Sequence, residues 1–377
     1  MPISDTPQFS RPIWAEVDLA ALRSNFEALA ALGPVTMIAV VKANAYGHGA
    51  VEVARALWDA DPQPAMLAVA SVDEGSQLRN AGIVAPILLL SAILPSEARA
   101  AVRAGLTPTV FTSEVAAAID AAGRAEGRIA EAHFKIDTGM GRLGAACDEA
   151  VELWKSFQTL PNLRIGGVYT HFACADEEDD PMSAVQLVAF KEFLAAIAPL
   201  ERNVLVHAAN SAAQMRYPEA RFAIARCGVS LYGASPSPCS NPFGVALLPV
   251  MALRARITHV REVRAGTSIS YGATWRAARD SRIATLPAGY ADGYSRSLSN
   301  RGQVLVGGQR CPIVGRVTMD ITLIDITDLE VGVDIGETVT LFGPGLPAEE
   351  VAAWAGTIPY EIFTSVAGRV SRIYSGG

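Results

Sequence analysis

The sequence lacks the features of a membrane-spanning, secreted or nucleic-acid-binding chain. Its longest apolar stretch, residues 83–94, is interrupted by Pro86 and is too short to span a bilayer. The first residues contain neither the basic region nor the apolar core of a signal peptide. The net charge is −7 and no basic cluster is present, which argues against nucleic acid as the main partner. We therefore expect a cytoplasmic protein that acts on a small molecule.

Cysteine and histidine are both scarce, with five of each in 377 residues. The cysteines are scattered and form no Cys-x-x-Cys motif, so we expect reduced thiols rather than a disulfide framework. No pair of histidines has the spacing of metal ligands, and we expect no required metal. His48, His133, His207 and His259 are expected to be structural.

Apolar strand-like runs alternate with alanine-rich helical stretches over the first two-thirds of the chain. Strands are expected at residues 37–42, 66–70, 86–90, 107–111, 132–137, 164–171, 204–208 and 222–228. Helices are expected between them, for example at residues 113–125, 148–160 and 182–198. This order predicts an α/β fold with a (β/α)8 TIM-like barrel. A doubly wound sheet is the alternative, but no Gly-x-Gly-x-x-Gly follows the first strand.

The composition changes at a run of turn-forming residues, Ser235-Pro-Ser-Pro-Cys-Ser-Asn-Pro, which we take as a domain boundary. Residues 1–240 are predicted to form the barrel and residues 241–377 a mainly β domain. Strands of this second domain are expected at residues 250–263, 267–271, 283–286, 303–306, 313–326 and 338–342. Residues 13–19 alternate like a half-buried strand, and Asp18 then caps a helix. This strand and the first ten or so residues are candidates for packing with the β domain.

Polar and charged residues follow five of the eight predicted barrel strands, where barrel enzymes keep their functional groups. In chain order they are Lys42, then Lys135, Asp137 and Arg142, then His171, then Asn210 and Ser211, and finally Arg226 and Gly228. Lys42 ends a buried apolar strand beside a glycine-bearing loop, a suitable place for a Schiff-base amine. The alternative for Lys42 is a lysine whose side chain extends to solvent. The alternative for Arg142 is a solvated arginine without a site role.

These residues provide what pyridoxal 5′-phosphate requires. The cofactor needs an amine, donors for its phosphate dianion and a group that tunes its pyridine nitrogen. Lys42 supplies the amine, and Arg226, two residues before Gly228, could reach the pyridine nitrogen. Ser211 begins a helix-like stretch, and Gly228-Val229 offers backbone N–H groups, both of which suit an anion. Pyridoxal 5′-phosphate is therefore the expected cofactor.

Nine motifs in series resemble the ordered motif set of bacterial alanine racemases and cover nearly the whole chain. They are Val40-Val-Lys-Ala-Asn-Ala-Tyr-Gly-His-Gly, Lys135-Ile-Asp-Thr-Gly-Met-Gly-Arg-Leu-Gly, Thr170-His-Phe-Ala, Ala209-Asn-Ser, Arg226-Cys-Gly-Val-Ser-Leu-Tyr-Gly, Ser270-Tyr-Gly, Gly289-Tyr-Ala-Asp-Gly-Tyr, Gly315-Arg-Val-Thr-Met-Asp and Ile358-Pro-Tyr-Glu. The resemblance implies a cytoplasmic pyridoxal-phosphate isomerase that interconverts L- and D-alanine with two bases, as a head-to-tail homodimer. The D-alanine would serve peptidoglycan synthesis, or the enzyme would serve alanine catabolism. A wider range that includes serine stays open.

The resemblance also implies roles for individual residues. Lys42 resembles the Schiff-base lysine and base for the D-enantiomer, and Tyr271 the base for the L-enantiomer, supplied to the partner's site. The other cofactor-binding matches are Tyr46, Ser211, Gly228, Val229 and Tyr360 at the phosphate, with Asn210 beside them, Arg226 at the pyridine nitrogen, His171 next to it, and Arg142 at the phenolic oxygen. Arg142 and Met319 match substrate contacts. Lys135 matches a lysine that is carbamylated in many relatives. The residues that match the entry corridor are Asp176, Tyr290, Arg296, Arg316 and Ile358. Thr318 departs from the pattern, because many relatives have cysteine there; the backbone role of Met319 tolerates this change.

Two other functions share part of the pattern. A pyridoxal-phosphate decarboxylase for basic amino acids would have the same two-domain plan, but it requires a Gly-rich phosphate loop after the seventh strand, and none is found there. A non-enzymatic single-barrel protein would keep Lys42 and the phosphate-binding residues. Such a protein has no use for a large second domain or for Tyr271.

Overall fold

The computed structural model describes residues 11–33, 36–237, 244–329 and 332–377, and the chain divides into two compact units. One unit comprises Leu22–Leu247, and the other comprises residues 11–21 together with Leu248–Gly377. The predicted boundary at residue 240 lies outside the described residues. Residues 13–18 form a strand that pairs within the β unit, where the sequence made them a candidate to pack.

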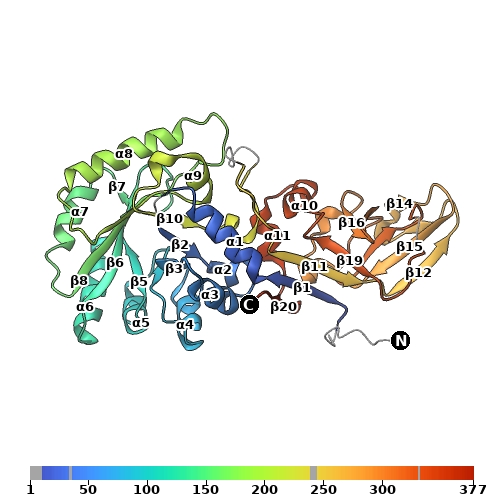
Figure 1. The fold of residues 1–377 in the computed structure, drawn as a ribbon, viewed down its shortest axis with the longest axis horizontal. Helices are drawn as coiled ribbons and strands as arrows, with labels where there is room; N and C mark the ends of the chain where they lie inside the picture. The colour runs from blue at the N-terminus through green and yellow to red at the C-terminus, as the bar shows by residue number, and fades with distance from the viewer. Residues whose placement is uncertain (1–10, 34–35, 238–243, 330–331) are drawn as a thin grey trace. The chain divides into compact units, whose positions relative to one another are not determined.

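Eight parallel strands form the barrel, in the spatial order β10-β2-β3-β4-β5-β6-β8-β9 (Figure 1). Their bounds are Thr36–Val40 (β2), Met66–Val69 (β3), Ile87–Leu89 (β4), Thr107–Val110 (β5), Ala130–Asp137 (β6), Leu163–Tyr169 (β8), Leu205–His207 (β9) and Ile224–Cys227 (β10). Between β9 and β10 the backbone N–H groups of Ala223 and Arg226 donate to the carbonyls of Val206 and Ala209. These bonds nearly close the ring, and the predicted (β/α)8 barrel is confirmed.

Helices surround the barrel strands (Figure 1). Their bounds are Ala50–Trp58 (α3), Val72–Asn80 (α4), Ala98–Arg103 (α5), Ser113–Ala125 (α6), Ala150–Phe157 (α7), Met182–Ala196 (α8) and Ser211–Arg216 (α9). Phe134 of β6 packs against Trp154 and Phe157 of α7 and Phe193 of α8, each with ring centroids 5.7 Å away. Such apolar contacts between strand and helix layers form the core. Over the described residues, no helix has the length and apolar character needed to cross a membrane.

The second unit is built around a six-stranded sheet in the order β17-β16-β19-β11-β1-β20. Its strands are Ile13–Asp18 (β1), Met251–Arg256 (β11), Gln303–Val306 (β16), Gln309–Pro312 (β17), Thr338–Phe342 (β19) and Ser371–Ser375 (β20). The opening strand β1 pairs antiparallel with β11 and parallel with β20, so it belongs to this sheet. Asp18 accepts hydrogen bonds from the N–H groups of Ala20 and Ala21, at the start of α1 (Leu19–Ala30). The division between the units runs through α1.

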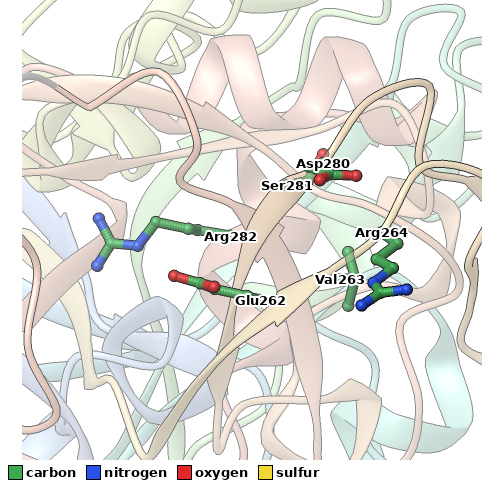
Figure 2. A pocket seen from close by; sticks show the side chains of 6 residues that line it. All are labelled: Glu262, Val263, Arg264, Asp280, Ser281 and Arg282. Carbon is green, nitrogen blue, oxygen red and sulfur yellow. The ribbon is translucent and has the colours of Figure 1, made fainter.

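Two smaller sheets complete the β unit. One contains His259–Val263 (β12), Ser281–Leu286 (β15) and Thr322–Asp325 (β18), and the other Ser268–Ile269 (β13) and Trp275–Arg276 (β14). The register of the antiparallel pair β12–β15 sets Glu262 opposite Arg282. Figure 2 shows these two side chains beside a pocket of about 440 Å³ that four neighbouring residues also line. The pocket contains none of the predicted site residues.

The β unit differs from the prediction in several places. The expected strand at residues 250–263 is two strands. The Ile257 N–H donates to the Glu337 carbonyl, next to β19, whereas the Thr258 N–H donates to the Thr285 carbonyl of β15. The chain therefore changes sheets at this point. Of residues 313–326 only β18 is a strand, with one isolated bridge at Ile313. Two helices, Ala348–Ala355 (α10) and Pro359–Ser365 (α11), were not expected.

Candidate active site

Lys42 lies just beyond the carboxyl end of β2 and begins a left-handed turn, α2 (Lys42–Tyr46). Residues 43–46 all have φ between 51° and 54°, a conformation that costs non-glycine residues roughly 1–2 kcal/mol each. The Asn44 side-chain oxygen accepts from the Ala50 N–H, and His48 Nδ1 lies 3.0 and 2.9 Å from two carbonyl oxygens of the turn. Side-chain hydrogen bonds within the turn and the loop after it therefore help to hold a backbone conformation that non-glycine residues disfavour.

The Lys42 amine is mostly removed from water. Burial lowers the pKa of Lys42, and the positive charge of Arg142 lowers it further, whereas the negative charge of Glu74 raises it. A neutral amine is therefore more accessible near neutral pH than it is for a solvated lysine. This is the protonation state that a nucleophile or a general base requires.

Lys135 is a second buried amine, on β6 and 4% exposed. Its Nζ atom lies 5.4 Å from the centre of the Tyr169 ring. Burial lowers its pKa to about 8, with further lowering by Arg226 and Arg142 and a smaller opposing effect of Asp137. Lys135 is thus also able to lose its proton close to neutral pH.

Arg226, on β10, is buried with its guanidinium held in one orientation. Its Nη1 atom lies 2.8 Å from His207 Nδ1, and its Nη2 atom donates to the carbonyls of Thr170 (2.8 Å) and Ala208 (2.9 Å). Nη2 also lies 3.1 Å from His171 Nδ1, so the contact implied by the resemblance is present. Burial lowers the pKa of Arg226 to about 10. The group still carries its proton at neutral pH and acts only as a donor.

The two histidines that contact Arg226 are neutral acceptors. Burial, and then the charge of Arg226, lowers the pKa of both His171 and His207 well below the usual value. His207 Nε2 lies 3.0 Å from Nδ1 of the equally buried His133. A proton on Nε2 of His207, donated to His133, leaves Nδ1 of His207 free to accept from Arg226. His133 and His207 were both expected to be structural, although His133 stands two residues before Lys135 and therefore on the same face of β6.

Asp137 fixes the loop that carries Arg142. Its carboxylate accepts hydrogen bonds from four successive backbone N–H groups, those of Gly139, Met140, Gly141 and Arg142, at 2.8–3.1 Å. Burial raises the pKa of Asp137, but the four donors together outweigh it and hold the pKa below its usual value. The backbone of Arg142 is therefore anchored to the end of β6.

Ser211, Gly228 and Tyr46 form a small polar cradle at the end of β10. The Gly228 N–H donates to Ser211 Oγ at 2.9 Å, which leaves the Ser211 hydroxyl proton available for another acceptor. A Cβ atom on residue 228 would lie 2.4 Å from the Tyr46 hydroxyl oxygen, so only glycine fits. Val229 follows directly, and the Asn210 side chain accepts from the Ala213 N–H at the start of α9. Asn210 thus shapes this cradle through the backbone.

In the β unit, Tyr271 lies in a 3-10 turn, Tyr271–Ala273, rather than in the expected strand. Its side chain is 72% exposed. Ser270 Oγ donates to the Arg316 carbonyl at 2.8 Å, and the Arg316 guanidinium lies 3.1–3.2 Å from where a Cβ on Gly272 would be. The turn that presents Tyr271 is thus packed directly on the segment of Arg316.

Met319 lies at the tip of a turn held by Thr318 and Gly289. The Thr318 hydroxyl donates to the Ile321 carbonyl at 3.0 Å, and the Tyr290 N–H donates to the Thr318 carbonyl. A Cβ on Gly289 would lie 2.3–2.4 Å from the Thr318 and Met319 backbones, so this close approach requires glycine. The threonine that departs from the family pattern therefore closes the turn that carries Met319.

The remaining predicted residues are divided between the two units. Tyr290 and Arg296 line one pocket of about 510 Å³ in the β unit. Ile358 precedes α11 and is 54% exposed, with Tyr360 two residues later in that helix. Asp176 lies in the barrel unit, between β8 and α8. Among the described residues, no three His, Cys, Asp or Glu side chains are grouped to hold a metal ion.

Comparisons with known proteins point to a single family. The models of the alanine racemase N-terminal and C-terminal domains match residues 17–236 and 250–374. The alanine racemase of Symbiobacterium thermophilum is 44% identical, with 97% of this chain and 98% of the relative covered. A solved alanine racemase from Clostridium difficile 630 has a TM-score of 0.91 at 35% identity, with 98% and 97% covered. One from Bartonella henselae, with covalently bound pyridoxal phosphate, has a TM-score of 0.87 at 30% identity, with 97% and 99% covered.

The Asp137 anchor predicts a pH-dependent stability. Asp137→Asn should lower the free energy of unfolding at pH 7 by about 1 kcal/mol, because an amide has one acceptor oxygen and the carboxylate is partly solvated. The folded-state pKa is lowered, so the stabilisation is full above the ordinary carboxyl pKa and is lost as the pH falls through the folded value. The difference in melting temperature from wild type should therefore shrink in acid. Asp148→Asn, at an exposed position, is the control. A difference for Asp137→Asn that is constant with pH would contradict the assignment.

Proposed function

Because the chain belongs to the alanine racemase family, we propose that it interconverts L-alanine and D-alanine with pyridoxal 5′-phosphate and two catalytic bases. The resemblance predicted from nine motifs is confirmed by matches to both family domains. Matches over nearly full length favour this activity over a decarboxylase or a single-barrel binding protein. The main structural support is the group of Lys42, Arg226 and the Ser211–Gly228 cradle at the carboxyl ends of the barrel strands.

The barrel residues fit pyridoxal 5′-phosphate. Lys42 offers a partly buried amine whose pKa is lowered, which suits a Schiff base with an aldehyde. The Ser211 hydroxyl and the backbone beside Gly228 suit a phosphate, and the absence of a Cβ there keeps the cradle open. When bound, the cofactor supplies an electron sink that makes the Cα proton of an amino acid acidic. Tyr46, Val229 and Tyr360 complete the proposed phosphate contacts.

Arg226 would face the pyridine nitrogen and donate a hydrogen bond to it. Its guanidinium is held by His207, His171 and two carbonyls, so it cannot turn away. Because arginine keeps its proton, the nitrogen would stay unprotonated and the ring a weaker electron sink. This restraint limits the reaction to removal and return of one proton.

Racemisation requires two bases, because a single base tends to return the proton to the face it left. One base must be unprotonated while the other carries the proton. We assign these roles to the Lys42 amine, for D-alanine, and to the Tyr271 hydroxyl, for L-alanine. Arg142 and the Met319 backbone would hold the substrate carboxylate, and Asp176, Tyr290, Arg296, Arg316 and Ile358 would form the corridor that admits small amino acids.

We further propose a head-to-tail homodimer in which Tyr271 and Met319 complete the partner's site. The β unit exposes both side chains, Tyr271 (72%) and Met319 (54%), and it also exposes Tyr290 (44%) and Ile321 (42%), whose backbones bond to Thr318 beside Met319. Clustered exposed apolar groups of this kind mark a contact surface. The barrel of a second copy would cover them. The product D-alanine would then supply peptidoglycan, the usual role in this family.

Lys135 is proposed to carry a carbamate. Its pKa of about 8 leaves an appreciable fraction of neutral amine, the form that reacts with carbon dioxide. Arg226, Arg142 and Lys42 each lower that pKa through positive charge, and the same charges would stabilise the carbamate anion that replaces the ammonium. The carbamate would then hold Arg142 in place.

Exchange of the α-proton in deuterated water tests the activity. Wild-type protein with pyridoxal 5′-phosphate should exchange and racemise both alanine enantiomers. Tyr271→Phe should slow proton removal from L-alanine more than from D-alanine, by about 100-fold or more, because general-base catalysis is lost on one face only. Tyr374→Phe, in β20 of the same unit, is the matched control. Equal losses for the two enantiomers would count against the two-base assignment, and wild-type protein without exchange would refute the activity.

A carbon-13 NMR spectrum tests the modification of Lys135. Protein equilibrated with ¹³C-bicarbonate should show a carbamate signal that disappears in Lys135→Arg, since arginine cannot form it. Lys155→Arg, at an exposed lysine that bonds to Glu152, should keep the signal. A spectrum without a carbamate signal, or one unaffected by Lys135→Arg, would show that Lys135 is unmodified.

A further inference from the structure

Glu74, on α4, bonds to the turn that begins at Lys42. Its Oε1 atom accepts from the Ala43 N–H at 2.8 Å, and its Oε2 atom accepts from the Ala70 N–H at 2.7 Å. Ala70 directly follows β3, which is the neighbour of β2 in the barrel. One carboxylate therefore joins the carboxyl ends of two adjacent strands, and it does so at the residue next to Lys42.

The position of Glu74 is set by the start of α4. Ser71 is the N-cap, and its hydroxyl accepts from the Glu74 N–H at 3.2 Å. In a capping box, the glutamate at this position bonds back to the N–H of the N-cap residue. Here the carboxylate instead reaches Ala70 and, outside its own helix, Ala43. The carboxylate therefore bonds to the end of β3 and to the active-site turn, both of them outside α4.

The turn needs such an anchor. Residues 43–46 are four successive non-glycine residues with positive φ, a backbone that persists only when its surroundings hold it. The bond to the Ala43 N–H fixes the peptide plane that joins Lys42 to Ala43. That plane determines where the Lys42 side chain leaves the backbone, and hence where its amine is placed.

Glu74 is also the negative charge that faces Lys42 from another element. Two positive charges also act on Lys42: Arg142, from the loop after β6, and Lys135, on β6. The carboxylate opposes these cations and raises the pKa of Lys42. It therefore affects both the place and the protonation of the amine.

We propose that Glu74 is a positioning residue for Lys42, which holds the left-handed turn in shape and supplies the counter-charge of the amine. The proposal rests on the function proposed above, because it matters only where Lys42 carries the cofactor. Glu74 touches neither substrate nor cofactor in this role. It acts through the Ala43 peptide and through its charge.

Uptake of pyridoxal 5′-phosphate by the full-length apoprotein tests the proposal. Binding is followed by absorbance as a function of cofactor concentration and pH, alongside the melting temperature. Glu74→Gln keeps the shape but removes the charge and one acceptor, and should weaken binding about ten-fold or more. It should also move the midpoint of the pH dependence to lower pH, because the group that raises the pKa of Lys42 is gone. Glu74→Ala should bind more weakly still.

Asp73→Asn is the matched control, since Asp73 is the exposed carboxylate adjacent in sequence, and it should behave as wild type. Glu74 variants with wild-type affinity and an unchanged pH midpoint would overturn the proposal. So would a lower melting temperature with an unchanged midpoint, which would show a purely structural role. A wild-type chain that binds no pyridoxal 5′-phosphate would instead overturn the proposed function, and this proposal with it.

Discussion

The cost of burying positive charge at one end of the barrel governs the site. Lys42, Lys135 and Arg226 all lie at or just beyond the carboxyl ends of strands. Lys135 and Arg226 are buried and Lys42 is partly buried, so an unpaired charge is expensive there. The two lysines respond by a lowered pKa. Arg226 cannot give up its proton, so carbonyls and neutral histidines surround it. Such a site favours anions, which is the chemistry of a phosphate, a carboxylate or a carbamate.

Two carboxylates near this site, those of Asp137 and Glu74, bond to backbone N–H groups. Asp137 anchors the loop of Arg142 through four backbone donors, and Glu74 joins the Lys42 turn to β3. Each carboxylate is held by N–H groups rather than by a direct ion pair with a lysine. The amines are thus left available for chemistry, while the backbone that carries them is fixed. In the β unit, Gly289 packs on the backbone of Thr318 and Met319, and Gly272, next to Tyr271, packs on the Arg316 guanidinium.

The barrel was predictable from the sequence because strands buried on both faces appear as continuous apolar runs. The position of Lys42 after β2 followed from the same pattern. The left-handed turn was not predictable, because Ala43-Asn-Ala-Tyr contains no glycine and its shape depends on Glu74, 31 residues away. His207 was missed for a similar reason, since its contact with Arg226 joins two strands that the sequence analysis treated separately.

The β unit was less predictable, because its short strands follow turns and changes of sheet. Nothing in residues 250–263 marks the change at Ile257, where the hydrogen-bond partner switches from β19 toward β15. The motifs carried more information than the periodicity here. Tyr271 was identified by resemblance, although its 3-10 turn was expected to be a strand.

The central claim is that each site combines Lys42 of one subunit with Tyr271 of the other, and subunit complementation tests it most directly. Lys42→Ala and Tyr271→Phe proteins should each be close to inactive. In a mixed dimer of the two variants, one site would contain both wild-type bases, so racemisation of alanine should return. If Tyr271 instead served its own subunit, every site would lack one base. A purified mixed dimer that stays inactive would contradict the account.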